Sequence, residues 1–134
     1  MIQEKYSLSA HEIEHFKVFG FILRRKVFTP DEVRLINEDF DKGKAFALRV
    51  RDNSALNIRG QMNWSNLGPD SPFLASLLED ERICGAAEQL LGHDVIGVSS
   101  NCNAFAGDRT EWHPDTDNPN YYGAKFLIYP QFLD

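Results

Sequence analysis

The sequence predicts an α+β domain in which helices come first and strands follow. Two helix-start patterns of the form S/T-x-x-E lie near the N-terminus, at Ser9–Glu12 and Thr29–Glu32. Small and β-prone residues dominate the last third of the chain. A length of 134 residues leaves room for one domain with a core. We therefore expect a single domain over residues 1–134, mainly helical over 1–93 and mainly strands over 94–134.

The first helix is expected to run from its Ser9 cap to about Phe19, because Gly20 suits the left-handed residue that ends a helix. The next segment, 21–25, is predicted to be a short strand. A second helix then begins at Pro30 and is expected to end at Gly43.

The middle of the chain predicts one strand and one long loop. Apolar residues alternate with other types over 46–50, which indicates a strand. Residues 52–66 are polar and broken, and Arg59, Gln61 and Trp64 stand out as candidates for binding a substrate. Arg59 could hold an anionic group there. The alternative is an ordinary surface loop.

The second half predicts two further helices and then strands. Ser71 and Asp80 are expected to begin the helices, and Gly92 to end the second of them. Strands are expected over 95–106 and 124–129, because both segments are rich in β-prone residues.

Composition and charge exclude several classes of partner. Hydrophobic residues make up 43% of the chain and charged residues 25%, as in ordinary globular proteins. A net charge of −6 offers no basic face for nucleic acid or for an anionic membrane. No apolar run approaches the roughly 18 residues of a membrane span, and no signal peptide is evident at the N-terminus. Cys84 and Cys102 are predicted to be buried, reduced thiols, which fits a cytoplasmic location.

The first helix contains a pattern that imitates a zinc protease. His11, Glu12 and His15 match H-E-x-x-H, in which two imidazoles one helical turn apart bind zinc. The longer form of that motif needs Gly and His where this chain has Val18 and Phe21. Glu12 is also accounted for as the partner of the Ser9 cap. These facts favour a solvated helix face.

The pattern with the most chemical content is His113-x-Asp115. In an extended backbone, residues i and i+2 point to the same side, so the imidazole and the carboxylate could bind one metal ion. They would supply two thirds of the 2-His-1-carboxylate triad of non-haem Fe(II) oxygenases. The alternative is a solvated loop, which Pro114 and Asn118-Pro119 would favour.

Three other polar residues are candidates for binding a cofactor. Asn101 and Asn103 share one face of a predicted strand, where paired amides could hydrogen-bond a carboxylate. Lys125 shares a strand face with Leu127 and Tyr129 and could project into a pocket. The alternatives are a polar sheet surface for the two asparagines and an edge position for the lysine.

Four segments together resemble a known family. The chain is similar to the N-terminal part of phytanoyl-CoA dioxygenase-type proteins, which are Fe(II)- and 2-oxoglutarate-dependent dioxygenases. Residues 8–21 resemble that family's opening helix and turn, and 27–33 its second helix start. Residues 111–116 resemble its W-H-x-D iron motif, and 123–134 the strand that follows. The resemblance therefore covers nearly the whole chain.

The resemblance implies a fold, an activity and two cofactors. It implies a double-stranded β-helix, a jelly roll of the cupin-like type, of which this chain holds only the first strands. It also implies that His113 and Asp115 bind Fe(II), that 2-oxoglutarate is the co-substrate, and that a small organic molecule is hydroxylated. Related halogenases have a small residue at the position of Asp115, so the carboxylate here argues for hydroxylation.

The chain departs from the family in its last part. The family uses a distal His and a 2-oxoglutarate-binding Arg, but no histidine follows His113 and no arginine follows Arg109. We therefore expect a fragment of a longer protein, inactive by itself. The alternatives are that a partner or a second copy supplies the missing strands, or that the chain is a non-catalytic module that oligomerises through an open sheet edge.

Overall fold

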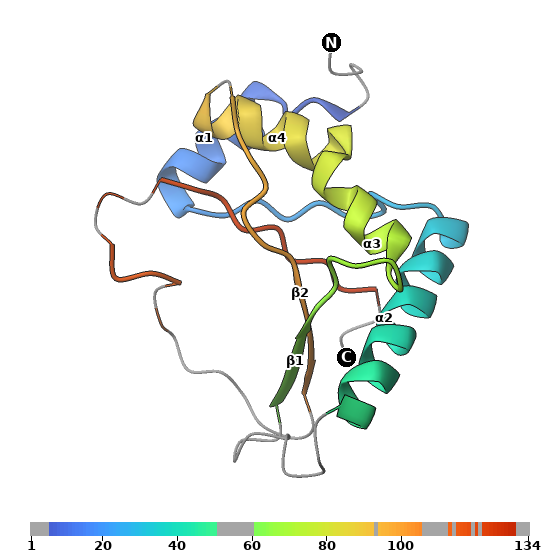
Figure 1. The fold of residues 1–134 in the computed structure, drawn as a ribbon. Helices are drawn as coiled ribbons and strands as arrows, with labels where there is room; N and C mark the ends of the chain where they lie inside the picture. Colours follow the sequence, from blue (N-terminus) through green and yellow to red (C-terminus); the bar gives the residue numbers. More distant parts are fainter. Residues whose placement is uncertain are drawn as a thin grey trace.

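The computed structural model describes residues 6–50, 61–92, 94–105, 113, 115–118, 120 and 122–130. Helices α1 and α4 lie at one end of the molecule and a two-stranded sheet lies at the other, with the long helix α2 alongside the sheet (Figure 1). In chain order the elements are α1 (Ala10–Phe19), α2 (Pro30–Val50), β1 (Gln61–Ser65), α3 (Pro72–Ser76), the 3-10 helix η3 (Leu77–Glu79), α4 (Glu81–Leu91) and β2 (Asn101–Phe105).

The start and the end of α1 agree with the prediction. The Ser9 backbone N–H donates to the Glu12 carboxylate at 2.8 Å, and the Glu12 backbone N–H donates to the Ser9 hydroxyl at 3.2 Å. At the other end Gly20 has φ of 78°, and its N–H donates to the Phe16 carbonyl at 2.7 Å. Both signals depend only on residues close in sequence, so they could be found without knowledge of the fold.

The strand predicted over 21–25 is wrong. The structure assigns no strand to this segment, and Phe21 and Leu23 are 58% and 70% exposed. A strand is stable only when a neighbour pairs with its backbone groups, and the described residues supply none here. Side-chain contacts fix the segment instead, because Arg24 donates to the Tyr6 carbonyl at 3.1 Å and contacts Glu12 at 3.3 Å.

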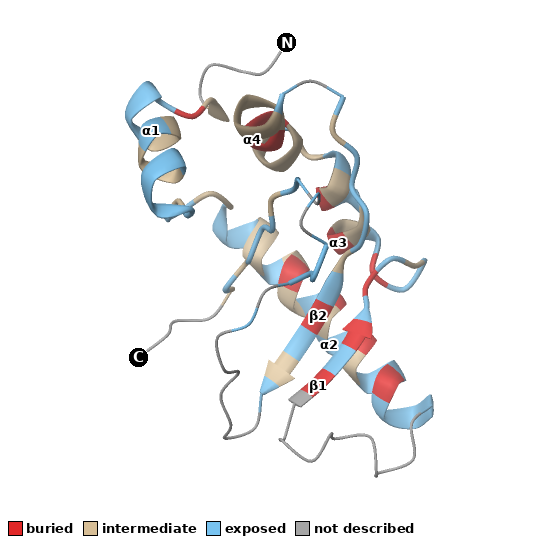
Figure 2. Cartoon of the chain, turned by 90° about the vertical axis from the view of Figure 1, so that its left-hand side faces the viewer, coloured by how far each residue is buried: buried red, intermediate tan, exposed pale blue. Residues whose placement is uncertain are grey.

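Helix α2 extends beyond the predicted end at Gly43. The helix continues to Val50, which also makes the strand predicted over 46–50 wrong. Its buried residues recur at helical spacing and form one stripe: Ile36, Asp39, Gly43 and Ala47. Phe46, Leu48 and Val50, whose alternation suggested a strand, are all exposed. Figure 2 shows buried and exposed positions side by side along α2.

Gly43 is a contact position and not a helix terminus. A Cβ atom built there would lie 2.5 Å from Nε1 and 3.0 Å from Cδ1 of the Trp64 side chain. Trp64 is itself 7% exposed and packs against Phe40, with 4.8 Å between ring centroids. Glycine at 43 therefore lets the indole lie directly against the helix backbone.

We expect Gly43→Ala to destabilise the protein although alanine is the better helix former. Alanine gains about 1 kcal/mol in a helix interior, but the clash with Trp64 costs about 1–3 kcal/mol. In a Trp64→Phe background the same change should become neutral or stabilising, because phenylalanine lacks the five-membered ring that carries Nε1 and Cδ1. Chemical denaturation of the four proteins measures this, and an unchanged effect of Gly43→Ala in both backgrounds contradicts the contact.

The sheet consists of β1 and β2 in antiparallel register. Met62 pairs with Ala104, Asn63 with Asn103 and Trp64 with Cys102. Alternate residues therefore share a face: Met62, Trp64 and Cys102 are buried, whereas Asn63, Asn101 and Asn103 are exposed. Residues 61–65 were expected to belong to a loop, so that prediction is wrong for this part. The predicted strand over 95–106 is confirmed only for 101–105.

One hydrophobic core joins α2, the sheet and the helices that connect the two strands. Its buried members are Ile36, Ala47, Met62, Trp64, Leu74, Leu77 and Cys102. Ile128 packs against this core from the C-terminal segment, although the strand predicted over 124–129 is not present. The double-stranded β-helix remains a prediction, because the described strands form a two-stranded sheet.

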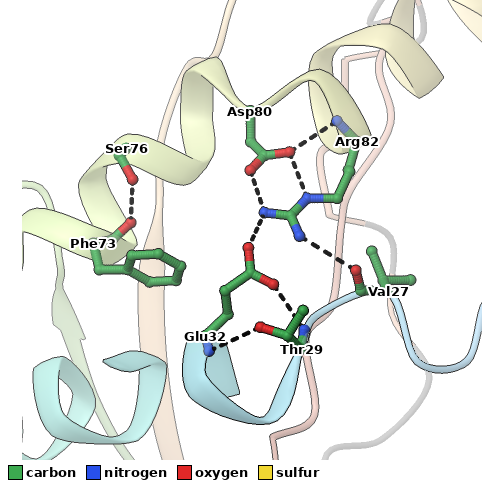
Figure 3. A network of polar contacts seen from close by, with 7 residues as sticks. All are labelled: Val27, Thr29, Glu32, Phe73, Ser76, Asp80 and Arg82. Carbon is green, nitrogen blue, oxygen red and sulfur yellow. Dashed lines mark hydrogen bonds and ion pairs between the residues drawn. The ribbon is translucent and has the colours of Figure 1, made fainter. Parts of the chain in front are cut away.

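An arginine joins the beginnings of α2 and α4 (Figure 3). The Arg82 guanidinium contacts Glu32 at 2.7 Å and Asp80 at 2.6 Å, and it donates to the Val27 carbonyl at 3.3 Å. It also lies 4.5 Å from the centre of the Phe28 ring, within cation–π range. Only 10% of the Arg82 side chain is exposed. The carboxylates of Glu32 and Asp80, at the N-terminal ends of α2 and α4, therefore share one buried cation.

The expected beginnings of the other helices hold. Asp80 caps α4 by accepting from the Arg82 backbone N–H at 2.8 Å, and Gly92 has φ of 102° at the end. Helix α3 follows Ser71 as predicted, but Ser71 makes no side-chain cap. The buried Asp39 carboxylate takes that place, accepting from the backbone N–H groups of Phe73 at 2.8 Å and Leu74 at 3.2 Å.

Across the described ranges, none of the helices combines the length and the apolar character that a bilayer span requires.

Candidate functional site

His113 and Asp115 lie at the surface, in a stretch without regular secondary structure. An ammonium group is already in contact with the carboxylate, since Lys125 Nζ lies 2.8 Å from Asp115 Oδ1. Both side chains of this pair are more than half exposed. His113 is close enough to act electrostatically on Asp115. The structure therefore brings three of the predicted site residues, His113, Asp115 and Lys125, into one neighbourhood.

The segment that carries Lys125 is attached to the rest of the protein on both sides of the lysine. The Tyr122 hydroxyl donates to the Leu90 carbonyl at the end of α4, at 3.3 Å. On the other side Ile128 packs against the core. Lys125 thus lies in a segment that contacts the rest of the protein on both sides of it. Its ion pair with Asp115 links the preceding loop to this segment.

Between Asp115 and Lys125, two side chains accept hydrogen bonds from backbone N–H groups two residues further along the chain. The Thr116 hydroxyl accepts from the Asn118 backbone N–H at 3.1 Å, and the Asn118 side chain accepts from the Asn120 N–H at 3.0 Å. These are the turn contacts that Ser, Thr and Asn side chains commonly make. Asp115 is left to face Lys125, so the loop does not use its carboxylate as a turn cap in the described contacts.

Charge keeps the Asp115 carboxyl ionised. The hydrogen bond from Lys125 is the main cause that lowers the pKa of Asp115 below its usual range, and the nearby His113 adds a smaller effect in the same direction. An ionised carboxylate beside an imidazole suits a divalent first-row metal ion. The donor set therefore fits such an ion as two ligands on an open, solvent-facing position.

The described residues do not complete a metal centre. Within the described ranges, no group of three or more His, Cys, Asp or Glu side chains is arranged to hold an ion. Burial raises the pKa of the Cys102 thiol to about 11, so this cysteine is a protonated core residue. Burial likewise raises the pKa of Cys84, whose Sγ contacts the Leu78 carbonyl at 2.7 Å. Both cysteines are free thiols, but only Cys102 is buried as predicted, whereas Cys84 is partly exposed.

The other candidate residues have different surroundings. Asn101 and Asn103 do share the exposed face of β2, with Asn103 opposite Asn63. Trp64 lies in the hydrophobic core and not on a loop. Its Nε1 has no hydrogen-bond partner within the part of the chain that the structure describes. Trp64 therefore has a packing role, and substrate contact by this residue is not supported by its position.

Two predicted substrate residues fall partly or wholly outside the described structure. Arg59 lies outside the described residues. Gln61 is the first residue of β1, but its side chain is not described. Their role in holding a substrate stays a prediction.

The H-E-x-x-H residues have structural partners of their own. Glu12 serves the Ser9 cap, and its hydrogen bonds to Ser9 are the main cause that lowers the pKa of Glu12. The His15 ring packs against Phe19 and Phe21, with centroids 4.6 and 5.2 Å apart. A cavity of about 290 Å³ lies over this face and is lined by histidine, glutamate and apolar side chains. The interpretation of these residues as an ordinary helix face agrees with these contacts.

The contact between Asp115 and Lys125 was not predicted, although each residue was singled out. Residues ten apart in a loop follow no periodicity that a sequence pattern could reveal. The only signal available was the charge of Lys125 among apolar neighbours.

Curated relatives of this chain are dioxygenases. The ectoine dioxygenase of Bordetella bronchiseptica is 28% identical over an alignment of 115 residues, which covers 81% of this chain and 37% of that protein. The enzyme of the same name from Bordetella parapertussis matches to the same extent. That of Streptomyces anulatus is 24% identical over 129 residues, with 84% of this chain and 42% of that protein covered.

No family model and no solved structure matches the chain. The chain spans about two fifths of the length of the curated relatives it matches. At this level of identity, over four fifths of its own length, the chain is similar to part of a group of dioxygenases.

Proposed function

We propose that this chain forms part of a non-haem Fe(II)- and 2-oxoglutarate-dependent dioxygenase that hydroxylates a small organic molecule. His113 and Asp115 would hold the metal ion. The observation that carries the proposal is the agreement of two independent facts: the H-x-D residues lie together on an open surface, and the curated relatives are named dioxygenases.

The chemistry of the two side chains supports the choice of metal. Imidazole with carboxylate is a donor set of non-haem Fe(II) oxygenases, which leave other positions on the ion open. When bound, such an ion would let O2 hydroxylate an unactivated C–H bond while 2-oxoglutarate is oxidatively decarboxylated and supplies the other two electrons. The task of His113 and Asp115 would be to hold and orient the ion. A third ligand and a group for the co-substrate would have to come from other residues.

The decisive experiment measures metal affinity of the chain by anaerobic titration with Fe(II), with Mn(II) as a second probe. We expect His113→Ala and Asp115→Ala to weaken binding at least about tenfold, because each removes a direct ligand. Asp117→Ala is the matched control, since Asp117 is an exposed carboxylate two residues further along the same loop. Its effect should stay within about twofold, as expected for a carboxylate that is not a ligand.

Equal losses in the Asp115 and Asp117 variants would indicate nonspecific attraction and contradict the site. Addition of 2-oxoglutarate to the Fe(II)-loaded chain provides a second observation. A visible absorption band that requires Asp115 would mean that the chain, or a pair of chains, forms a complete site.

One structural observation favours a second function, a non-catalytic module that oligomerises through its sheet. The described sheet has two strands, so each strand leaves one edge unpaired within the described residues. Apolar residues are exposed near that sheet, among them Val98 and Phe105. Sedimentation over a wide concentration range tests this alternative, and a monomer throughout would contradict it.

A further inference from the structure

We propose that Lys125 acts as a built-in cation that occupies the Asp115 carboxylate until a metal ion replaces it. The proposal rests on the function proposed above, and it concerns how the same site is loaded. It assigns to Lys125 a competing role, different from the cofactor-binding role that its position in the sequence suggested.

The geometry places an ammonium group on the carboxylate that the metal ion would need as a ligand. Lys125 Nζ lies 2.8 Å from Asp115 Oδ1, the distance of a short charge-assisted hydrogen bond. A metal ion that used this oxygen as a ligand would have to displace the ammonium from it, because both carry positive charge. The ammonium and the ion therefore compete for one carboxylate.

The protein holds the lysine near the carboxylate without the help of a metal. Tyr122 and Ile128 attach the segment on either side of Lys125, through the Leu90 carbonyl and the core respectively. The Asp115 loop is instead shaped by local turns, so it can adjust more easily than the lysine segment. Lys125 thus stays near the site after Asp115 changes partner.

Charge determines the direction of the effect. A dication approaching Asp115 loses part of the attraction because the lysine already neutralises the carboxylate, and it is also repelled by the ammonium. Both contributions disappear when the lysine is replaced by an uncharged side chain of similar length.

The test compares Mn(II) affinity of the chain and its variants, measured by the loss of the free-ion signal in electron paramagnetic resonance. We expect Lys125→Met to bind Mn(II) about three- to tenfold more tightly than the unchanged protein at low salt. The gain should shrink as ionic strength rises, because both partners are exposed and therefore screened. Lys125→Arg keeps the charge and should leave the affinity near its original value.

Lys17→Met is the matched control. Lys17 is also an exposed lysine in an exposed ion pair, 2.7 Å from Glu14, so its removal changes the net charge equally. Its effect on Mn(II) affinity should stay within about twofold, since Lys17 is paired with Glu14 and not with a proposed metal ligand. An equal gain in the Lys17 and Lys125 variants would show a general charge effect and overturn the proposal.

The outcomes separate this proposal from the proposed function. If Lys125→Met binds Mn(II) no more tightly while Asp115→Asn weakens binding, the competition is overturned and the metal site stands. Weaker binding by Lys125→Met also overturns it, since the lysine would then be supporting the site. If Asp115→Asn has no effect, or if no variant binds the ion, the metal site fails and the competition fails with it.

Discussion

Replacement of Arg82 by methionine is expected to lower the free energy of unfolding by about 2–4 kcal/mol. Arg82 is 90% buried at its side chain and neutralises both Glu32 and Asp80 at distances of 2.7 and 2.6 Å. Without the guanidinium, two carboxylates remain close together with little water around them, and the Val27 carbonyl loses its partner. Thermal and chemical denaturation measure the loss.

Arg34, an arginine on the surface of α2, provides the control. Arg34 contacts Glu38 at 2.6 Å, but both side chains are about half exposed. Arg34→Met should cost no more than about 0.5 kcal/mol, as for other exposed pairs one helical turn apart. If both substitutions lower the free energy of unfolding equally, the burial of Arg82 does not strengthen its ion pairs.

The same cluster predicts how stability depends on pH. The hydrogen bond from Arg82 lowers the pKa of Glu32 from its usual value near 4.5 to about 2, and Arg82 lowers the pKa of Asp80 as well. Because these pKa values are lower in the folded protein, the unfolded protein binds protons first as the pH falls. The stabilisation is therefore complete above about pH 5 and is lost as the pH falls towards 2. The difference between the original protein and Arg82→Met should narrow over that interval.

Replacement of Asp39 by alanine is expected to cost about 2–3 kcal/mol. Asp39 is 4% exposed and accepts hydrogen bonds from the backbone N–H groups of Phe73 and Leu74, at 2.8 and 3.2 Å. N–H groups in the first turn of a helix have no acceptor within the helix, and Ser71 makes no cap bond that could replace Asp39. The substitution leaves them buried without an acceptor.

Amide hydrogen exchange separates this cause from a general loss of packing. In Asp39→Ala the amides of Phe73 and Leu74 should exchange faster than those elsewhere in α3–α4, whereas Asp39→Asn should retain part of their protection. Asp41→Ala is the control, because Asp41 is exposed on the same helix. Its cost should stay within about 0.5 kcal/mol. Uniform acceleration throughout the protein would contradict the capping role of Asp39.

The contrast between the two capping boxes and Asp39 shows how far the sequence could predict this fold. Ser9 with Glu12, and Thr29 with Glu32, are three residues apart, so the sequence contains the whole contact. Asp39 caps α3 through the backbone N–H of Phe73, which is 34 residues further along the chain, and no local pattern predicts that partner. Short-range chemistry was predictable for this reason, and the partners that tie the elements together were not.

The errors over 43–50 have one physical cause. Glycine and alternating apolar residues suggested a helix end followed by a strand, because each pattern was considered by itself. The structure uses Gly43 to accept the Trp64 ring and places Phe46 on the exposed side of α2. Burial against a partner far along the chain overrode both local preferences. At the candidate site, the H-x-D spacing predicts that His113 and Asp115 bind one ion, which stays a prediction, whereas no spacing indicates the contact of Asp115 with Lys125.

The pairing of β1 with β2 has a consequence for how the chain reaches this structure. The two strands are joined through α3, η3 and α4, so the register from Gln61↔Phe105 to Ser65↔Asn101 encloses all three helices in one loop. Closing so long a loop costs chain entropy before any strand contact repays it. If α3, η3 and α4 form first, they shorten the distance that the loop must span. We therefore expect the helices to assemble early and the sheet to close late, with the helical segment acting as the template on which the two strands meet.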